Sequence, residues 1–376
     1  MNQRLKSKRH RLRSVDVKVL EGLALYGPRN ISRVAARLNM PLGTLRYRIN
    51  YLRSHFSLHF SGSVYHTNIG LRKVVVFAES NPGYEELLYQ CLKSNDYWLY
   101  VSRCFGAPKS VAIYGIPVGK EKEFEEFLSE LQGADQICDV RFFWSTSFQT
   151  VNTTNTWFDN ASEAWTFPWD SWLKEVMTAK EELPYTLKDP DDYPQKADWV
   201  DIIILKELEK DCTVKLQEIA KKIGLSLQGV KYHFENHVIQ EKMFEGHQIV
   251  AYHYREFSGE TYYFRFVFKN YESFVKFTSS LLNKPFVRAA GKIYGQNQLF
   301  VQIYLPRQQL TNFIETLSKL IKAGFLNTYE YVIQDLTKRE RQTISYEFFT
   351  DNHWVYNHKK YLERLQSTLK QFLQAA

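Results

Sequence analysis

The sequence predicts an α+β protein in which two winged helix-turn-helix domains are each followed by a ferredoxin-like β-α-β-β-α-β domain. Two observations predict this fold. A helical pattern of apolar residues over 15–53 recurs over 200–238, 185 positions later and without a gap. An alternating, strand-like pattern follows each copy, and its matching positions are 189 residues apart. The chain is therefore predicted to be an internal tandem duplication.

Three short amphipathic helices are predicted in each copy of the first pattern, because the apolar positions have the spacing of one buried helical face. They are Val15, Val19, Leu20, Leu23, Ile31, Val34, Ala35, Leu38, Leu42, Leu45, Ile49 and Leu52 in the first copy, and Val200, Ile204, Leu205, Leu208, Leu216, Ile219, Ala220, Ile223, Leu227, Val230 and Phe234 in the second. The turn before the third helix falls at Asn39-Met40-Pro41 and at Gly224-Leu225-Ser226. Asn or Gly tolerates a left-handed backbone there, and Pro or Ser suits a helix start.

Positive charge is concentrated at the N-terminal end of the chain. Residues 1–60 hold 13 Lys or Arg and 2 acids, a net charge of +11, against +8 for the whole chain. A localised basic surface on a helix-turn-helix is typical of phosphate contact, because neutralised phosphates release their counterions. Three short helices also occur in helical cores that bind no nucleic acid, but the charge favours double-stranded DNA as the partner.

The outward face of the third predicted helix supplies the candidate DNA-reading residues. Helix-turn-helix proteins place the N-terminal part of this helix in the major groove, where Arg can bind guanine and Tyr or Thr can contact phosphate or a thymine methyl group. The candidates in the first copy are Gly43, Thr44, Arg46, Tyr47 and Arg48. Their counterparts in the second copy are Gln228, Gly229, Lys231, Tyr232 and His233.

The second copy lacks the charge excess of the first. Residues 198–255 hold 8 Lys or Arg and 9 Asp or Glu, a net charge of −1. We expect this copy to bind DNA more weakly by itself, and a packing or dimerising module is the alternative for it.

Residues 1–13 are predicted to form a flexible basic arm, because they are rich in charge and poor in apolar residues. Arg9, Arg11 and Arg13 are its candidate DNA contacts. Such arms can enter the minor groove beside a helix-turn-helix, and a solvated tail is the alternative. No apolar stretch follows these charges as in a signal peptide, and no window of about 18 apolar residues occurs elsewhere. We therefore expect a cytoplasmic protein without a membrane segment.

The pattern after each three-helix copy has the ferredoxin-like order. In the first copy it predicts strand 71–79, helix 82–93, strands 97–104 and 110–117, helix 120–131 and strand 137–148. In the second copy it predicts strand 261–268, helix 271–282, strands 286–294 and 299–305, helix 308–322 and strand 326–333. Phe105-Gly106 matches Tyr294-Gly295, and Phe124 matches Phe313.

Each copy ends in an aromatic segment and an amphipathic helix. We expect these tails to pack against their own or the other copy, because buried aromatic residues commonly dominate cores, rather than to form an exposed partner site. A Pro-rich acidic linker joins the copies. The predicted domains are a basic arm (1–13), winged helix-turn-helix 1 (14–70), ferredoxin-like domain 1 (71–150), aromatic tail 1 (151–182), the linker (183–197), winged helix-turn-helix 2 (198–258), ferredoxin-like domain 2 (259–335) and aromatic tail 2 (336–376).

Few features of the sequence suggest catalysis. Cys91, Cys104, Cys138 and Cys212 form no CxxC pair, and we expect buried thiols in a reducing cytoplasm. His233 and His237 are four residues apart, but an isolated pair is weak evidence for a metal site, and His237 aligns with the core residue Leu52. Neither a phosphate-binding glycine loop nor a nucleophile elbow is present. We therefore predict a protein that is not an enzyme and has no cofactor and no metal.

The architecture resembles the archaeal and bacterial Lrp/AsnC family of transcription regulators, here in a tandem, fused form. The most specific segments are PLGTLRYRINYL at 41–52 and SLQGVKYHFENH at 226–237, which look like that family's third helix. The resemblance implies that ferredoxin-like domains pair through their sheets, that one chain imitates a dimer, and that homo-oligomers and a small-molecule effector are expected. Gly106-Ala107 and Gly295-Gln296 depart from the Gly-Asp pair usual in the family's effector loop.

Two functions of different kinds follow. The first is a transcription regulator whose two helix-turn-helix units read neighbouring half-sites about 34 to 36 Å apart. The alternative is an architectural, chromatin-like protein that binds DNA with low sequence specificity. A ligand sensor built on the ferredoxin-like pair is a third reading, and it would require a ligand that distinguishes two states.

Overall fold

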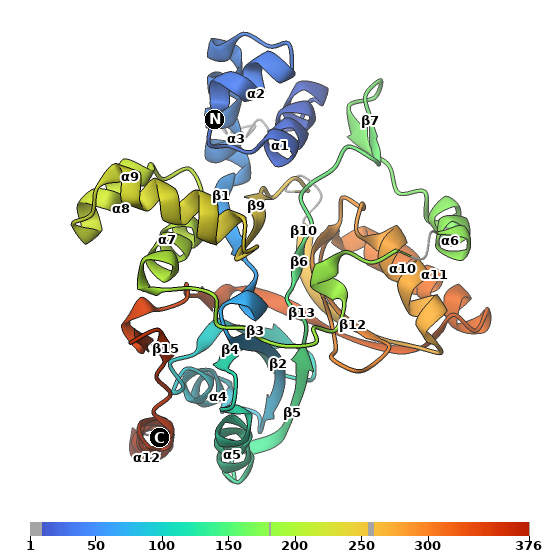
Figure 1. Cartoon of the computed structure of the whole chain (residues 1–376). Coiled ribbons are helices and arrows are strands. Elements are labelled where there is room, and N and C mark those ends of the chain that lie inside the picture. Colours follow the sequence, from blue (N-terminus) through green and yellow to red (C-terminus); the bar gives the residue numbers. More distant parts are fainter. Residues whose placement is uncertain (1–9, 180–181, 255–258, 376) are drawn as a thin grey trace, which may run out of the picture.

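The computed structural model describes residues 10–179, 182–254 and 259–375 and shows a mixed α+β protein (Figure 1). The first three-helix unit consists of α1 (Ser14–Tyr26), α2 (Ile31–Arg37) and α3 (Leu42–Phe56), followed by β1 (His59–Val64). Asn39 has a φ of 50°, so the left-handed residue predicted between the second and third helices is confirmed.

The second three-helix unit consists of α7 (Trp199–Lys210), α8 (Leu216–Ile223) and α9 (Leu227–Tyr232). Gly224 takes a φ of 71°, again in the left-handed region. The last helix does not end at Tyr232 but continues as a π-helix over His233–Ile239. The strand β9 (Phe244–Val250) follows.

The two units are joined by their strands. In the described residues, each third helix is followed by a single strand, and β1 pairs antiparallel with β9 from His59↔Val250 to Val64↔Phe244. The two units therefore share one two-stranded ribbon, to which each contributes the strand that follows its third helix. Figure 1 shows α1–α3 beyond one end of this ribbon and α7–α9 beside it.

A β-α-β-β-α-β segment follows each ribbon strand. The first consists of β2 (Leu71–Ser80), α4 (Glu85–Leu92), β3 (Trp98–Phe105), β4 (Ser110–Pro117), α5 (Glu121–Gln132) and β5 (Ile137–Ser145). The second consists of β10 (Gly259–Phe268), α10 (Tyr271–Leu281), β11 (Val287–Lys292), β12 (Gln298–Pro306), α11 (Leu310–Lys322) and β13 (Leu326–Arg341). The strand orders β5-β2-β4-β3 and β13-β10-β12-β11 agree with the predicted ferredoxin-like connections.

The two half-sheets form one continuous sheet that closes on itself. β13 extends well beyond the predicted strand and pairs with β3 from Ile333↔Phe105 to Arg341↔Tyr100. At the opposite edges, an isolated bridge joins Ser145 to Ile293. A small apolar core fills the interior between the sheet faces: Val75, Phe77, Cys104, Val111, Tyr263, Ile293, Phe300 and Val332. Closure removes most exposed strand edges.

The tail helices cross over between the halves. α6 (Trp169–Thr178), at the end of the first half, packs on α10 and α11 of the second. α12 (His358–Ala375), at the end of the second half, packs on α4 and α5 of the first. The fully buried Trp172 stacks on Phe313 with ring centroids 5.8 Å apart. Each tail thus covers the helical layer of the other half.

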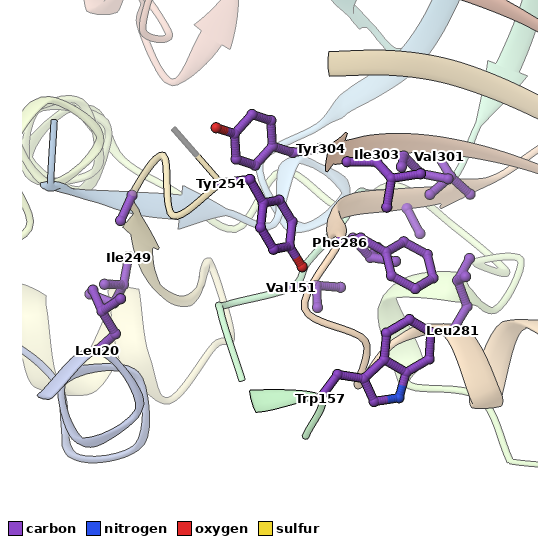
Figure 2. Packing of buried hydrophobic residues seen from close by; sticks show 14 of the residues in the cluster. Leu20, Val151, Trp157, Ile249, Tyr254, Leu281, Phe286, Val301, Ile303 and Tyr304 are labelled. Carbon is purple, nitrogen blue, oxygen red and sulfur yellow. The ribbon is translucent and has the colours of Figure 1, made fainter. Parts of the chain in front are cut away.

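The two main hydrophobic cores also combine residues from both halves of the chain. One cluster of buried residues contains α1–α3, α6 and the sheet of the second half, and the other contains α7–α9, α12 and the sheet of the first half. Figure 2 shows part of the first cluster, with Leu20 facing Ile249 on one side and Trp157 beside Phe286 on the other. These two aromatic rings have centroids 5.2 Å apart. Neither half therefore has a complete core of its own.

The connecting segments contain short elements. They are the 3₁₀ turns His66–Asn68, Tyr185–Leu187, Arg307–Gln309 and Tyr346–Phe348, and the two-residue strands β6 (Gln149–Thr150), β7 (Phe158–Asp159), β8 (Ala164–Trp165), β14 (Phe349–Thr350) and β15 (His353–Trp354). The predicted linker is packed at Thr186 and Leu187, which are fully buried. None of the described helices combines the length and the apolar character that a bilayer crossing requires.

Candidate nucleic-acid interface and central cavity

The N-terminal half of α3 presents a polar face to solvent. Thr44 and Arg46 are exposed, and 63% of Tyr47 is accessible. A Cβ at Gly43 would meet no other atom within 4 Å, so this position lies in open space. Leu45 and Ile49 are buried on the opposite side and hold the helix against its unit. The exposed candidates can therefore contact a ligand as large as a DNA duplex.

Arg48 does not belong to this exposed face. Its guanidinium turns inward, with Nη1 3.4 Å from Oδ1 of Asp16, whose side chain is fully buried at the start of α1. Burial raises the pKa of the Asp16 carboxyl, and the nearby Arg48 opposes this shift. An isolated buried carboxylate is costly, so Arg48 compensates charge inside the unit. The structure thus places Arg48 in a contact inside the unit rather than on the outward face predicted for it.

The corresponding face of α9 is also open. Gln228 and Lys231 are exposed, as is 56% of Tyr232. The backbone N–H of Gly229 donates to Oγ of Ser226 at 3.0 Å, which fixes the start of the helix. Lys231 forms a 3.7 Å ion pair with Glu235, so its charge is partly balanced within the helix.

His233 turns inward like Arg48, the residue aligned with it. Its Nδ1 lies 3.0 Å from Oδ1 of Asp201, which occupies the position of Asp16 in the second unit. His237 joins the same group, with Nδ1 3.1 Å from Oδ2 of Asp201. His233 therefore lies in a contact inside the unit rather than on the outward face predicted for it. His237 is aligned with the core residue Leu52, but its side chain lies beside Asp201.

The described part of the N-terminal arm is packed against its neighbours. Leu12 is buried, and the Arg11 guanidinium donates to the carbonyl oxygens of Ser162 and Glu163. Arg13 is exposed, while its backbone N–H donates to Asp16 as part of the helix cap. Residues 10–13 are thus held by these contacts and do not form the flexible arm predicted for them. Arg9 lies outside the described residues.

A cavity of about 180 Å³ with both apolar and polar lining residues lies between the β1–β9 ribbon and the interior of the closed sheet. A second cavity of about 310 Å³ shares Tyr100, Gln248, Gln302 and Arg341 with it, so the two adjoin. The ribbon contributes Gln248, and the sheets of both halves contribute Tyr100 and Gln302. The cavities therefore form where the two halves meet, beneath the three-helix units.

Three arginines give the second cavity a strong positive charge. Arg288, Arg339 and Arg341 line it, and no carboxylate of the described residues forms a salt bridge with any of them. Arg288 is held by the carbonyl of Ala251, Arg339 by the hydroxyl of Tyr252, and Arg341 lies 3.3 Å from Oε1 of Gln248. Arginines without acidic partners are suited to carboxylate or phosphate ligands.

Buried groups with shifted pKa values lie in and beside the first cavity. Burial lowers the pKa of Lys73, which lines the cavity, to about 8. Burial raises the pKa of Glu245, which lies behind the lining residue Ser63, to about 7. Burial also lowers the pKa of His66 well below its usual value, so this imidazole is neutral. Nδ1 of His66 lies 2.9 Å from the carbonyl of Val64, while its buried Nε2 has no hydrogen-bond partner among the described residues. A ligand in this cavity could therefore hydrogen-bond to His66.

Sequence analysis missed this second group of residues. His66 and Lys73 are close in sequence, but Arg288 and Arg341 come from two distant segments, and no spacing in the sequence connects them to the first two. The one local signal is the run Lys338-Arg339-Glu340-Arg341, where alternation within the long strand β13 separates two arginines from Glu340. Glu340 also contributes to the lining of the second cavity, but its carboxylate pairs with Lys93 at 2.7 Å.

The cysteines give no sign of a shared site. Cys91, Cys104 and Cys212 are buried as expected, whereas Cys138 is exposed on β5 and corrects the expectation that all four are buried. All four thiols are free.

Comparison with known proteins identifies one domain by sequence. A winged helix-turn-helix DNA-binding domain model matches residues 200–236, which include α7, α8 and α9. No curated protein matches the chain. This match lies in the second unit, although the first unit carries the excess of positive charge.

Solved structures share parts of the arrangement at low identity. A Pyrococcus furiosus transcriptional regulatory protein of the AsnC family is 19% identical with a TM-score of 0.30, covering 35% of this chain and 88% of that one. Escherichia coli AsnC is 18% identical with a TM-score of 0.29, covering 39% of this chain and 97% of that one. These likenesses concern the arrangement of elements within about a third of the chain.

A likeness of full length is found with the siroheme decarboxylase NirDL, at 9% identity and a TM-score of 0.49, covering 95% of this chain and 99% of that one. The prediction that the chain is not an enzyme is corrected by this finding, because the structure that it resembles over its full length is an enzyme. At this identity no activity is carried over. The chain is thus similar in arrangement to both AsnC-family regulators and a decarboxylase.

Proposed function

We propose that the protein is a DNA-binding transcription regulator, built as an internal tandem duplication, whose two three-helix units address neighbouring half-sites of double-stranded DNA. The observation that carries this proposal is the shared exposure of aligned residues on α3 and α9. Arg46 and Tyr47 in the first unit correspond to Lys231 and Tyr232 in the second, and all four are exposed. The apolar sides of both helices are buried, so these polar faces are held in a fixed position.

The two units are proposed to contribute unequally. The first lies in a segment with a net charge of +11, whereas the segment around the second has a net charge of −1. Phosphate contacts supply most of the non-specific affinity of DNA-binding proteins. The first unit therefore supplies most of the affinity, and the second extends the recognised sequence.

Selection from a randomised duplex library at moderate salt, followed by sequencing, tests this proposal. An enriched two-part motif spaced by about one helical turn would support a tandem regulator that uses both units. A single enriched half-site would leave the second unit without a reading role. Tight, salt-sensitive binding without enrichment would instead favour an architectural protein.

A second function is supported by the central cavity: binding and acid–base turnover of a small carboxylate. The specific observation is the group Arg288, Arg339 and Arg341, none of which forms a salt bridge with a carboxylate of the described residues. Such a group would bind a carboxylate through paired N–H donors. Lys73, which lines the adjoining first cavity and has a pKa of about 8, could exchange a proton with the bound ligand near neutral pH.

Thermal-shift and calorimetric titrations with a panel of small mono- and dicarboxylates, and with inorganic phosphate, test this second function. At least one carboxylate should raise the melting temperature of the full chain, because it binds only the folded state. Arg341→Gln should abolish that shift. Arg307→Gln is the matched control, since Arg307 is an exposed arginine outside the cavity. Failure of every probe, or an equal loss in the control, would remove the cavity from consideration.

A further inference from the structure

Four side chains with metal-ligating atoms converge in the second three-helix unit. Asp198 and Asp201 come from the start of α7, and His233 and His237 come from the π-helix that continues α9. One ligand atom from each residue lies within 4.8 Å of the others. The group contains two imidazole nitrogens and two carboxylates, which is a chemically mixed ligand set rather than a patch of acids.

The carboxylates are held in place by the backbone. Oδ1 of Asp198 accepts from the N–H of Asp201 at 3.0 Å, and Oδ2 of Asp201 accepts from the N–H of Asp198 at 3.0 Å. This reciprocal capping box leaves Oδ2 of Asp198 facing His233 at 3.4 Å, and Oδ1 of Asp201 facing the same imidazole at 3.0 Å. The oxygens are thus oriented towards the histidines without further rearrangement.

The π-helix explains why His237 takes part. In the first unit α3 is a regular α-helix, and the aligned residue Leu52 is fully buried in the apolar core. A π-helical turn contains more residues than an α-helical one, so it rotates the positions that follow it around the helix axis. His237 consequently lies beside Asp201. Such π turns are frequent at functional sites.

The aligned positions of the first unit hold different residues. There the buried Asp16 is neutralised by Arg48, and the positions aligned with Asp198 and His237 are Arg13 and Leu52. The second unit replaces both arginines and the leucine by an aspartate and two histidines. Within the described part of the chain, no Lys or Arg forms a salt bridge with Asp198 or Asp201. The two carboxylates of the second unit are therefore not paired with a lysine or arginine of the described residues, as Asp16 is in the first unit.

We propose that Asp198, Asp201, His233 and His237 bind a divalent first-row transition metal ion, with zinc preferred. Two nitrogen and two oxygen ligands suit zinc in four-coordinate geometry, whereas magnesium and calcium prefer sites made of oxygen alone. The ion would occupy the place that the Arg48 guanidinium fills in the first unit. It would join α7 to the helix that carries Lys231 and Tyr232, and so fix the orientation of that helix.

Metal titration of the full chain, after removal of bound ions with a chelator, tests this inference. Calorimetry with Zn²⁺ should give one tight site per chain, and Co²⁺ should give the visible absorption of a four-coordinate ion. Asp198→Asn should lower the affinity by at least about 10-fold, the loss seen even when residues that only support a metal ligand are changed. Asparagine is as good an N-cap as aspartate, so this variant should keep α7 intact.

His237→Leu installs the residue of the first unit and should give a similar loss. His353→Ala is the matched control, because His353 is an exposed histidine outside the cluster, and it should bind as the unchanged protein does. Zn²⁺ should raise the melting temperature of the control but not that of Asp198→Asn. An absence of tight binding, or equal affinity in the control and both cluster variants, would overturn the inference and leave a hydrogen-bonded histidine–aspartate network.

Discussion

Arg48 on α3 and Asp16 on α1 form an ion pair across the first three-helix unit, with Nη1 3.4 Å from Oδ1. The Asp16 side chain is fully buried, and only 21% of the Arg48 side chain is accessible. The pair therefore fastens the candidate recognition helix to the first helix of its own unit. This relationship separates the residues that hold the helix from those that can contact DNA.

Replacing Arg48 by alanine should destabilise the first unit by about 3 kcal/mol, because it leaves a buried carboxylate without its cation. The measurement is hydrogen exchange of α1 and α3 in the full chain, which reports the free energy of local opening. Arg46→Ala is the control and should change stability by no more than about 0.5 kcal/mol, since Arg46 is exposed. Equal protection in the two variants would contradict the structural role of Arg48.

Arg46→Ala should weaken DNA binding more than Lys231→Ala. Both residues are exposed on aligned helices, but only the first lies in a strongly basic segment, and Lys231 is paired with Glu235. Loss of one base contact costs about 1 to 3 kcal/mol, and loss of one phosphate contact lowers the salt slope by about one. Binding curves at several salt concentrations distinguish the two, and identical losses would exclude the proposed inequality of the units.

Trp172→Ala should destabilise the half of the protein to which Trp172 does not belong in sequence. This residue is buried against Phe277 and Phe313 of the second half, so truncation should cost about 3 to 5 kcal/mol. Hydrogen exchange should increase in α10 and α11 and remain unchanged in α4 and α5.

Leu365→Ala is the reciprocal variant, because the fully buried Leu365 of α12 belongs to the core of the first half. Exchange should then increase in α4 and α5. Faster exchange confined to the half that carries the substitution would show that the tails do not cross over in solution.

Glu245 should make the protein less stable as pH rises from about 4.5 to about 7. Burial raises the pKa of this carboxyl from 4.5 to about 7, so the folded state binds a proton that the unfolded state has released in this range. The contribution of Glu245 to the free energy of unfolding is fully present below the pKa that this carboxyl has in the unfolded chain. It is lost as pH rises through the pKa that the carboxyl has in the folded protein. The shift corresponds to roughly 3 kcal/mol.

Glu245→Gln removes the titration while keeping the shape of the neutral acid. Denaturant unfolding of both proteins across this pH range gives the difference in stability. The unchanged protein should lose stability relative to the variant as pH rises, and parallel pH profiles would refute the assignment to Glu245.

Much of the secondary structure could be predicted from the sequence, because it depends on neighbouring residues. The spacing of apolar residues gave the helices, and Asn39 and Gly224 gave the turns through their tolerance of a left-handed backbone. The outward positions Arg46 and Tyr47 followed from the same periodicity. The position of the Arg48 side chain could not be predicted in this way, because it reaches back to Asp16. Helical periodicity gives the direction of a Cα position, but it does not give the position of the guanidinium at the end of a long side chain.

The sequence by itself thus determined the kinds, order and approximate bounds of the elements, and the concentration of positive charge in the first unit. Only the tertiary structure decided that α6 and α12 exchange halves, that β13 continues into a polar segment to pair with β3, and that Arg288 and Arg341 meet in one cavity. These features depend on contacts between residues far apart in the chain. Such contacts are selected by the burial of surface and the pairing of strand edges, and local sequence patterns do not record them.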